Sequence, residues 1–419
     1  MPTSTNFSPF RAPCARTRTT RNSVTRALII GGGIAGTGTA MALQQAGIDS
    51  VVYEAYPGGA DDVGSFLTVF ANGMDALRAI DAHQPVLESS FPAEKTDAFD
   101  SAGRPAGQGS LGGRRGIGPR TLTRAQLYRV LRDEGTRRGL RIEYGKRLIG
   151  AENAPGGGVI AHFEDGSQAE GDLLIGADGV HSTVRRVIDP AASEARYGGT
   201  IVISGYAENA PVPPAPQTYR VTYGSRIMFA YTTTPDGETW WFTNVPESCT
   251  ENLEFDSAER WKNRVADLLS GDNTPVIDLI RSTERIFAVP AYHLPVLPVW
   301  YTPTMVLVGD SAHAAKPQAG HGASMALEDS VTLAKCLRDI ATIEDAFATY
   351  DRLRRARVAR VSATSARMSK FATPAGALTR IFRDVVILRL AKARNRNADD
   401  WLIDHHIDWS APITDGHPV

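Results

Sequence analysis

Three glycines near the start of the chain have the spacing of a phosphate-binding turn. Gly31, Gly33 and Gly36 form the pattern G-x-G-x-x-G. The first glycine permits a tight turn, the second lets the backbone approach a pyrophosphate, and the third lets a helix pack closely on a strand. Glu54 follows after about 20 residues, where an acid can hydrogen-bond a ribose hydroxyl. These residues predict a dinucleotide site whose acid would repel a 2′-phosphate, and they do not separate NAD from FAD.

The elements around the glycines occur in the order that such a site requires. Residues 27–30 are an apolar run typical of a strand buried on both faces. A helix is predicted to follow the glycine turn and to continue through residues 40–46, and residues 51–53 form a second strand that leads into the acid. The N-terminus of the helix offers free N–H groups and the positive end of its dipole to a phosphate.

A second G-x-G-x-x-G, at Gly107, Gly109 and Gly112, lacks this context. No buried strand precedes it and no helical pattern follows it, as a dinucleotide turn would require. We therefore interpret the Gly- and Arg-rich segment 100–120 as a mobile loop.

Two further pairs of glycine and acid follow apolar runs. Asp178-Gly179 ends one predicted strand, and Gly309-Asp310 ends another. A helix begins near Gly320 to Ala323, and an earlier one has Thr123 as its predicted N-cap. Between about 186 and 285, strand-like runs joined by Pro- and Gly-rich turns predict an antiparallel sheet with one face available.

The overall composition is that of a soluble globular protein. The 419 residues are 42% hydrophobic and carry a formal net charge of −1, which gives no support for nucleic-acid binding or for attraction to a membrane surface. The three cysteines show no C-x-x-C spacing and favour a reducing, cytoplasmic location without a metal site. No apolar run approaches the ~20 residues of a membrane span. Residues 1–23 are interpreted as a disordered tail, with an organelle transit peptide as the alternative.

In this order the three glycine and acid blocks resemble the single-component, or class A, FAD-dependent aromatic hydroxylases, which include p-hydroxybenzoate, salicylate and urate hydroxylases. The likeness covers about residues 24 to 372, and its most specific block is GDSAHAAKPQAGHGASMALED, which begins at Gly309. The resemblance implies an α/β fold: a Rossmann-like FAD-binding domain with an inserted antiparallel-sheet substrate domain and C-terminal helices. The expected limits are 24–70, 105–186 and 284–372 for the FAD-binding domain, 71–104 and 187–283 for the substrate domain, and 373–419 for a C-terminal helical segment.

The resemblance also assigns cofactor contacts. Gly31, Gly33 and Gly36 would hold the FAD pyrophosphate, together with Ile34 and Ala35 between the second and third glycines. Glu54 would bind the adenosine ribose, Arg124 the phosphate and ribose region, and Asp310 the ribityl chain. Asp178 and Gly179 match a motif associated with both FAD and NAD(P)H.

A last group would contact the flavin ring itself. Pro317 matches a proline beside the reacting face of the flavin, and Gly320, Gly322 and Ala323 match a helix start under the ring. A helix N-terminus there would stabilise the negative charge of reduced flavin. His321 stands where many relatives have Gln, and its charge could vary near neutral pH.

Substrate contacts are expected from the middle of the chain. Arg226 occupies the place of a substrate-binding arginine in urate-type relatives, so we expect it to anchor an anionic or carbonyl group. The aromatic residues of the strand-like runs are expected either to line a substrate pocket or to pack a core. Alternation sends Trp240 and Phe242 to one face of a strand and Trp241 to the other. The residues expected to contact substrate are Arg226, Phe229, Tyr231, Trp240 and Phe242.

The reaction that the resemblance implies is oxygen transfer. NADH or NADPH reduces FAD, O2 adds at the flavin C4a, and the hydroperoxide delivers one oxygen atom to an aromatic or other electron-rich small molecule. Three alternatives remain: a Baeyer–Villiger oxygenase on the same fold, a flavin reductase or halogenase, and a flavin-binding scaffold without turnover. We expect a monomer or homodimer, interpret His313 as mainly structural, and interpret the arginine-rich helix after residue 343 as a solvated face.

Overall fold

Short apolar runs from distant parts of the chain form a parallel sheet. The computed structural model describes residues 26–58, 65–112, 116–248, 257–316, 320–372 and 400–413. The sheet has the order β18-β12-β1-β2-β8, and all of its pairings are parallel. Its strands are β1 (Ala27–Ile30), β2 (Ser50–Glu54), β8 (Arg141–Tyr144), β12 (Leu173–Gly176) and β18 (Met305–Leu307). All residues of β1, β2, β12 and β18 are buried, as expected for strands covered on both faces.

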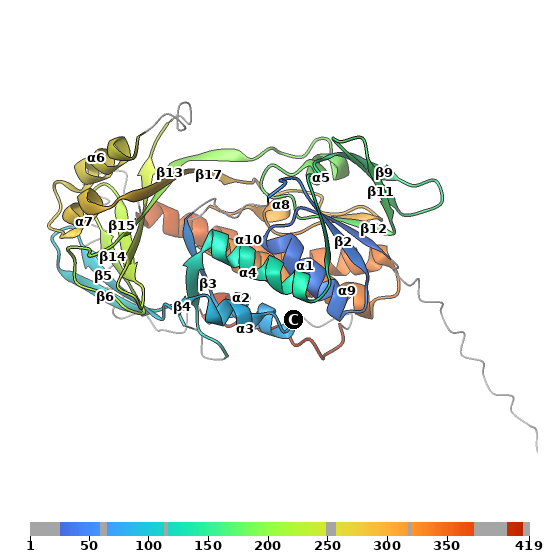
Figure 1. The fold of residues 1–419 in the computed structure, drawn as a ribbon, viewed down its shortest axis with the longest axis horizontal. Helices are drawn as coiled ribbons and strands as arrows, with labels where there is room; N and C mark the ends of the chain where they lie inside the picture. The colour runs from blue at the N-terminus through green and yellow to red at the C-terminus, as the bar shows by residue number, and fades with distance from the viewer. Residues whose placement is uncertain are drawn as a thin grey trace, which may run out of the picture.

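Helices pack around this sheet and against one another (Figure 1). Helix α9 contacts α1, α2 and α10, and α1 also contacts α4. The α4 helix begins as predicted, because Thr123 and Gln126 form a reciprocal capping box. The helices of this part are α1 (Ile34–Gln45), α2 (Ala71–Ala79), α3 (His83–Glu88), α4 (Arg124–Arg137), α5 (Thr183–Ile188), α8 (Asp310–His313), α9 (Gly322–Asp339), α10 (Ile343–Ala372) and α13 (Asp400–Ile403).

A second, larger sheet of seven strands has the order β17-β13-β16-β15-β14-β5-β6 and is called the large sheet here. All of its pairings are antiparallel except β5 with β14. Its strands are β5 (Lys95–Asp100), β6 (Pro105–Ser110), β13 (Arg196–Ala207), β14 (Thr218–Tyr223), β15 (Met228–Thr233), β16 (Thr239–Pro246) and β17 (Arg285–His293). Helices α6 (Ala258–Leu269) and α7 (Val276–Ser282) cover one face, and their apolar residues share a core with it.

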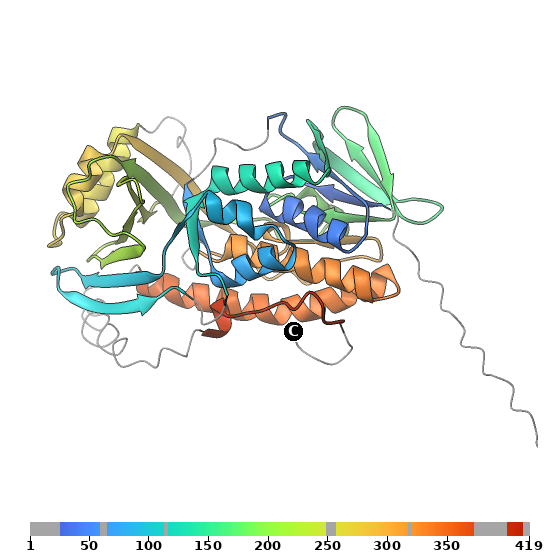
Figure 2. The same ribbon diagram turned by 60° about the horizontal axis from the view of Figure 1, so that its bottom comes forward.

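A small antiparallel sheet lies between the two main parts. It has the order β3-β7-β4, from β3 (Phe66–Val69), β4 (Phe91–Pro92) and β7 (Arg120–Thr123). Another small sheet is formed by β9 (Leu148–Asn153), β10 (Val159–Phe163) and β11 (Gln168–Gly171). Figure 2 shows the long α10 helix running from the side of the parallel sheet toward the large sheet. The predicted fold class, a parallel α/β layer with a separate antiparallel sheet, is confirmed.

The segment that carries the second glycine motif was expected to be a loop, and this is wrong for part of it. Residues 105–110 form β6, an edge strand that pairs with β5 through a turn at residues 101–104. The pattern concealed the strand because its residues are small or polar and mostly exposed. An edge strand needs partners on one side only, so a glycine-rich sequence is tolerated there.

The expected domain limits also differ from the placement of the elements. Helices α2 and α3 pack on α9 and α4, although they fall within 71–104, which was assigned to the substrate domain. Strands β6 and β17 belong to the large sheet, although the FAD-binding domain was expected to include them. The chain therefore crosses between the two parts more often than composition indicates. We propose that α2 and α3 belong to the FAD-binding domain, and that β6 and β17 belong to the substrate domain.

Some expectations lie outside the described residues. These are the N-terminal tail of residues 1–23, Pro317, and residues 373–399 and 414–419 of the expected C-terminal helical segment. The described part of that segment contains the short helix α13 and otherwise irregular chain up to residue 413. Among the described helices, none is long and apolar enough to cross a membrane.

Candidate active site

The glycine turn after β1 needs glycine for identifiable steric reasons. Gly31 has a φ of +99°, and a Cβ added there would lie 2.5 Å from the Ala177 carbonyl oxygen. A Cβ added at Gly36 would lie 1.8 Å from the carbonyl oxygen of Gly31. At Gly33 the same addition meets no atom within 4 Å, so the head of α1 faces open space. This space, next to a helix with no acidic residue in its first turn, fits the phosphates of a dinucleotide.

Glu54 closes the turn from the end of β2. Its Oε2 accepts the Gly32 N–H at 2.7 Å, and its Oε1 accepts the Tyr56 N–H at 2.9 Å. Only 7% of the residue is exposed. The carboxylate is thus fixed beside the glycine turn, where it fits a ribose.

Asp178 stands against the same turn, because a Cβ on Gly31 would come within 3.0 Å of the Asp178 Cα. Its Oδ2 accepts the N–H groups of Thr183 and Val184, at 2.7 and 3.1 Å, in the first turn of α5, and so adds to the cap that the N-cap residue Ser182 provides. Burial raises the pKa of Asp178 even though these hydrogen bonds oppose the shift. The structure therefore gives Asp178 a capping role, and its contact with FAD or NAD(P)H stays a prediction.

Gly309 lies where the N-terminal ends of α1 and α9 come close to each other. Its φ is +61°, and an added Cβ would lie 3.0 Å from the Ala35 Cβ and 3.2 Å from the Ala326 Cβ. Asp310 follows with its side chain exposed, and a Cβ on Gly322 would be 3.8 Å from its Oδ1. The residues predicted to hold the pyrophosphate, the ribityl chain and the flavin ring are therefore neighbours, although they lie almost 300 positions apart in sequence.

His321 is the N-cap residue of α9 and makes no side-chain capping hydrogen bond. Its ring stacks on Phe70 with the ring centroids 4.1 Å apart. Burial lowers the pKa of His321 to about 4, and its Nδ1 has no hydrogen-bond partner among the described residues. This shift disagrees with the expectation that its charge varies near neutral pH, because burial of the ring outweighs the attraction of nearby Glu328.

The structure defines the predicted cofactor contacts of Arg124 and Gly179 less well. Arg124 begins α4 with an exposed side chain, and its backbone N–H donates to the Ser65 carbonyl at 2.9 Å. Its assignment to FAD stays a prediction. Gly179 has a φ of +75° and open space around an added Cβ. Arg185 ties this turn to α8, because its Nη atoms donate to the carbonyl oxygens of Val180 and Ser311, at 2.9 and 3.2 Å.

The two faces of the large sheet carry different aromatic residues. Trp240 belongs to a group of side chains that faces the small β3-β7-β4 sheet, and we call this group the aromatic cluster. Trp241 lies in the core under α6 and α7, so the predicted alternation is confirmed. The aromatic cluster comprises Phe66, Phe91, Tyr206, Tyr219 and Trp240, with Phe242 and Phe287 packed against it.

Phe229 and Tyr231 were expected to contact substrate, and the structure contradicts this. Both lie in the core under α6 and α7. Phe229 has no exposed surface and stacks on Trp241 at 5.1 Å, and the Tyr231 hydroxyl donates to the Pro213 carbonyl. Alternation places them there, because strands β15 and β16 pair in a register that puts Phe229 opposite Thr243 and Tyr231 opposite Trp241.

Arg226 is likewise on the α6 side of the large sheet. Its Nε donates to the Leu268 carbonyl at 3.1 Å, and its Nη2 bonds the Asp267 carbonyl and the Ser270 hydroxyl. The guanidinium thus binds carbonyl groups in the last turn of α6, where a cation also suits the helix dipole. This position contradicts the expected role of Arg226 as a substrate anchor.

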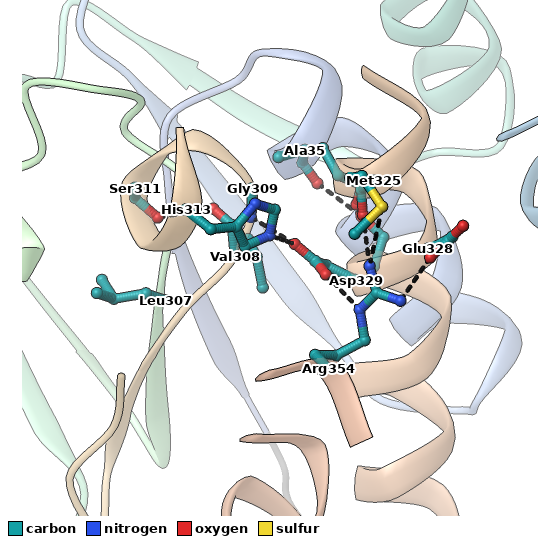
Figure 3. Close-up of polar contacts among 12 residues, drawn as sticks. Ala35, Leu307, Val308, Gly309, Ser311, His313, Met325, Glu328, Asp329 and Arg354 are labelled. Carbon is teal, nitrogen blue, oxygen red and sulfur yellow. Dashed lines mark hydrogen bonds and ion pairs between the residues drawn. The ribbon is translucent and has the colours of Figure 1, made fainter. Parts of the chain in front are cut away.

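The arginine-rich helix α10 was expected to be a solvated face, and this is wrong for its most buried member. Arg354 is 1% exposed, and its guanidinium pairs with Glu328 and Asp329 of α9 (Figure 3). Asp329 also pairs with His313, which supports the structural interpretation of that histidine. Periodicity could not show that one arginine of the series meets two carboxylates of another helix.

Sequence reasoning also missed a set of hydroxyl groups beside the aromatic cluster. The Tyr219 hydroxyl lies 3.0 Å from the Thr68 Oγ1 and 3.2 Å from the Thr121 Oγ1, and the two threonines are 2.9 Å apart. Burial raises the pKa of Tyr219, so the phenol stays protonated. No local signal could reveal this group, because its members come from β3, β7 and β14.

A parallel α/β layer with a dinucleotide turn is joined here to an antiparallel sheet with an aromatic face. Residues 24–365 match the family model of the FAD binding domain, and the chain belongs to this family. It is an FAD-dependent monooxygenase of class A, as the resemblance implied.

Its relatives include enzymes with named aromatic substrates. The FAD-dependent urate hydroxylase of Klebsiella pneumoniae is 31% identical over 347 residues, which cover 80% of this chain and 86% of the relative. The 6-hydroxynicotinate 3-monooxygenase of Pseudomonas fluorescens is 29% identical over 367 residues, covering 81% and 90%. The crystal structure of Klebsiella pneumoniae HpxO complexed with FAD and uric acid has a TM-score of 0.78 at 23% identity, covering 91% of this chain and 95% of that chain.

Proposed function

We propose that this protein uses NADH or NADPH to insert one oxygen atom from O2 into an uncharged aromatic small molecule. The observation that carries the substrate class is the composition of the aromatic cluster. The cluster is linked to the flavin site through β3, because Phe66 lies in the cluster and Phe70, just after the strand, stacks on His321. Ligand sites occur preferentially at the interfaces between such parts.

The members of the aromatic cluster are close together yet retain some exposure. The ring centroid of Phe66 lies 5.4 Å from that of Trp240 and 5.9 Å from that of Phe242. Phe66, Tyr206, Tyr219 and Trp240 are each 6–8% exposed, whereas Phe229 and Trp241 in the other core are fully buried. The partial burial of Phe242 and Phe287, which pack against the cluster, supports an accessible aromatic surface there.

The charged side chains that contact the edge of the aromatic cluster are Glu238, which accepts the Trp240 Nε1–H at 2.7 Å, and Arg285. Arg285 lies over the Tyr206 ring, and its guanidinium is already paired with Glu238 at 2.5 Å. A carboxylate or urate anion placed on the cluster would lose water without gaining a partner, which is strongly unfavourable. Hydroxyl groups of Tyr219 and its threonine partners offer hydrogen bonds to an uncharged polar substituent instead.

In the assigned site, the protein binds and orients the cofactor. The N-terminal ends of α1 and α9 would offer N–H groups to the phosphates and to the reduced flavin ring. Glu54 would accept a hydrogen bond from the ribose. The neutral His321 would add a hydrogen-bonding group without adding charge. Bound FAD supplies the redox chemistry, taking electrons from the nicotinamide nucleotide and activating O2 for transfer to substrate. The apolar cluster excludes water from the reacting molecule.

The relatives support an aromatic, often heterocyclic, substrate without fixing its identity. Two of them are named for urate and 6-hydroxynicotinate. The predicted anchor for an anion, Arg226, is bound to α6 here, so we do not extend the substrate charge of these relatives to this chain. A cytoplasmic location and a monomeric or homodimeric state remain part of the proposal.

The test is aerobic oxidation of NADH and of NADPH by the FAD-loaded protein with matched pairs of aromatic compounds. Each pair has the same ring and carries either a carboxamide or a carboxylate. We expect kcat/KM to be at least about tenfold higher for the uncharged member, because the carboxylate must be desolvated. Equal or higher values for the carboxylates would contradict the proposed substrate class. Product masses and ring connectivity distinguish hydroxylation from Baeyer–Villiger insertion, and absence of any oxidation would favour the scaffold alternative.

A further inference from the structure

One buried carboxylate joins α9 to the turn that presents Asp310. Asp329 has no exposed surface and accepts three hydrogen bonds. Its Oδ2 receives the Gly309 N–H at 2.8 Å and lies 2.5 Å from the His313 Nε2, while its Oδ1 receives the Arg354 Nε at 2.6 Å. Figure 3 shows Asp329 between His313 and Arg354. The carboxylate therefore connects both ends of α8 to α10.

Arg354 fixes this carboxylate from the opposite side. Its Nη1 pairs with Glu328 at 2.5 Å, and its Nη2 donates to the Met325 carbonyl at 3.2 Å. Burial opposes ionisation of all three groups, yet the attraction between them lowers the pKa of Glu328 and Asp329 and raises that of Arg354. Removing one partner of such a group leaves an uncompensated buried charge.

The turn at Gly309 has a backbone conformation that residues other than glycine rarely adopt. Gly309 has a φ of +61° and lies in contact range of Ala35 and Ala326, at the heads of the two helices assigned to FAD. Asp310, the next residue, is exposed at the same place. An error in the position of Gly309 would therefore move Asp310 relative to both helix heads.

We propose that Asp329 and Arg354 are positioning residues for FAD. The N–H of Gly309 is held by Asp329, Asp329 is oriented by Arg354, and the pair thereby sets the position of Asp310 without touching the cofactor. The inference depends on the assignment of Asp310 to FAD. It adds that the buried Asp329–Arg354 pair supports the turn that presents Asp310. It does not depend on the substrate.

Arg357 provides a matched control on the same helix. It pairs with Glu328 through its Nη2 at 2.6 Å and its Nε at 2.7 Å, so it belongs to the same buried group of charges. Its other contacts are the carbonyl oxygens of Trp401 and Leu402, each at 3.0 Å, and not Asp329. Replacing it disturbs the charge group without releasing the turn.

The experiment titrates FAD into apoprotein prepared from the wild type and from R354K, D329N and R357K, with flavin fluorescence as the readout of Kd. The thermal unfolding of each apoprotein and the visible absorption spectrum of each saturated complex are measured alongside. We expect R354K and D329N to raise the Kd for FAD by at least about tenfold and to shift the flavin spectrum, since the turn loses its anchor. R357K should lower Tm comparably and leave Kd within about threefold of the wild type.

Two results would overturn the proposal. One is an unchanged Kd in both R354K and D329N, and the other is a Kd that rises in all three variants in proportion to the loss of Tm. If R354K yields no folded apoprotein, D329N decides by the same criteria, because its amide keeps the volume of the carboxylate. The titration requires no turnover, so its failure is distinguishable from failure of the proposed substrate class.

Discussion

At the scale of single residues, we propose that Glu54 connects the dinucleotide turn to the cofactor. Its two carboxylate oxygens already hold the N–H groups of Gly32 and Tyr56. We predict that E54Q raises the Kd for FAD by about tenfold, because a neutral amide is a weaker acceptor for a ribose hydroxyl and for these N–H groups. Fluorescence titration of the apoprotein measures the change.

The control for Glu54 is E170Q, which changes an exposed glutamate on β11. It should bind FAD as the wild type does. Equal Kd values for E54Q and the wild type would contradict the ribose assignment.

His321 makes a prediction about pH and stability. Its pKa is about 4 in the folded protein and near 6.5 in an unfolded chain, so the unfolded state binds more protons between these values. The free energy of unfolding must therefore fall as the pH decreases from about 6.5 toward 4. For this residue alone the loss is about 2 kcal/mol at pH 5.

The comparison of the wild type with H321Q isolates this contribution, because other titrating groups are common to both. Denaturant unfolding at pH 7 and pH 5 should show that the wild type loses about 2 kcal/mol more than the variant. An identical loss in both proteins would mean that His321 is not buried as a neutral ring.

At the scale of elements, the large sheet uses its two faces differently. Phe229 on β15 packs under α6 and α7, whereas Phe242 on β16 packs against the aromatic cluster. We predict that F229A lowers the free energy of unfolding by about 3–5 kcal/mol with little change in KM for a substrate that turns over. F242A should raise KM severalfold with a smaller loss of stability, because it is only partly buried.

The two variants serve as controls for each other, since both remove one phenyl ring from a neighbouring strand of the same sheet. Denaturant unfolding and steady-state kinetics are measured on both. A rise in KM for F229A and none for F242A would reverse the assignment of the faces.

The sequence predicted those features of the fold and the site for which a local pattern of residues has a single physical explanation. The glycine turn, the acid that ends β2, the N-cap at Thr123 and the alternation of Trp240 and Trp241 follow from neighbours in the chain, and all of these features are present. The β6 strand could not be predicted in this way, because an exposed glycine-rich edge strand has no periodicity to detect.

Contacts between distant elements were the main source of error. Arg354 looks like a surface residue in the sequence, and only the packing of α10 on α9 brings it to Glu328 and Asp329. Arg226 looks available for a ligand until α6 is placed beside it. In each case the decisive partner comes from another helix, so spacing within a segment carries no information about it.

At the scale of the whole molecule, the chain brings two kinds of surface to one junction. The parallel layer contributes glycine turns, helix N-termini and the exposed Asp310, and the large sheet contributes an aromatic face. The small β3-β7-β4 sheet connects them, since Phe66 packs in the aromatic cluster while Phe70 stacks on His321. This arrangement suits a redox cofactor that acts on an apolar ring beside it.

The most direct test of the account follows the oxygen atom. The FAD-loaded protein, NADH or NADPH and the best uncharged aromatic substrate are incubated under 18O2, and the product is analysed by mass spectrometry. The account predicts one 18O atom in each product molecule and none when the label is supplied as H2 18O. A product without label from 18O2, or oxidation of the nicotinamide nucleotide that yields only hydrogen peroxide with every aromatic compound, would contradict it.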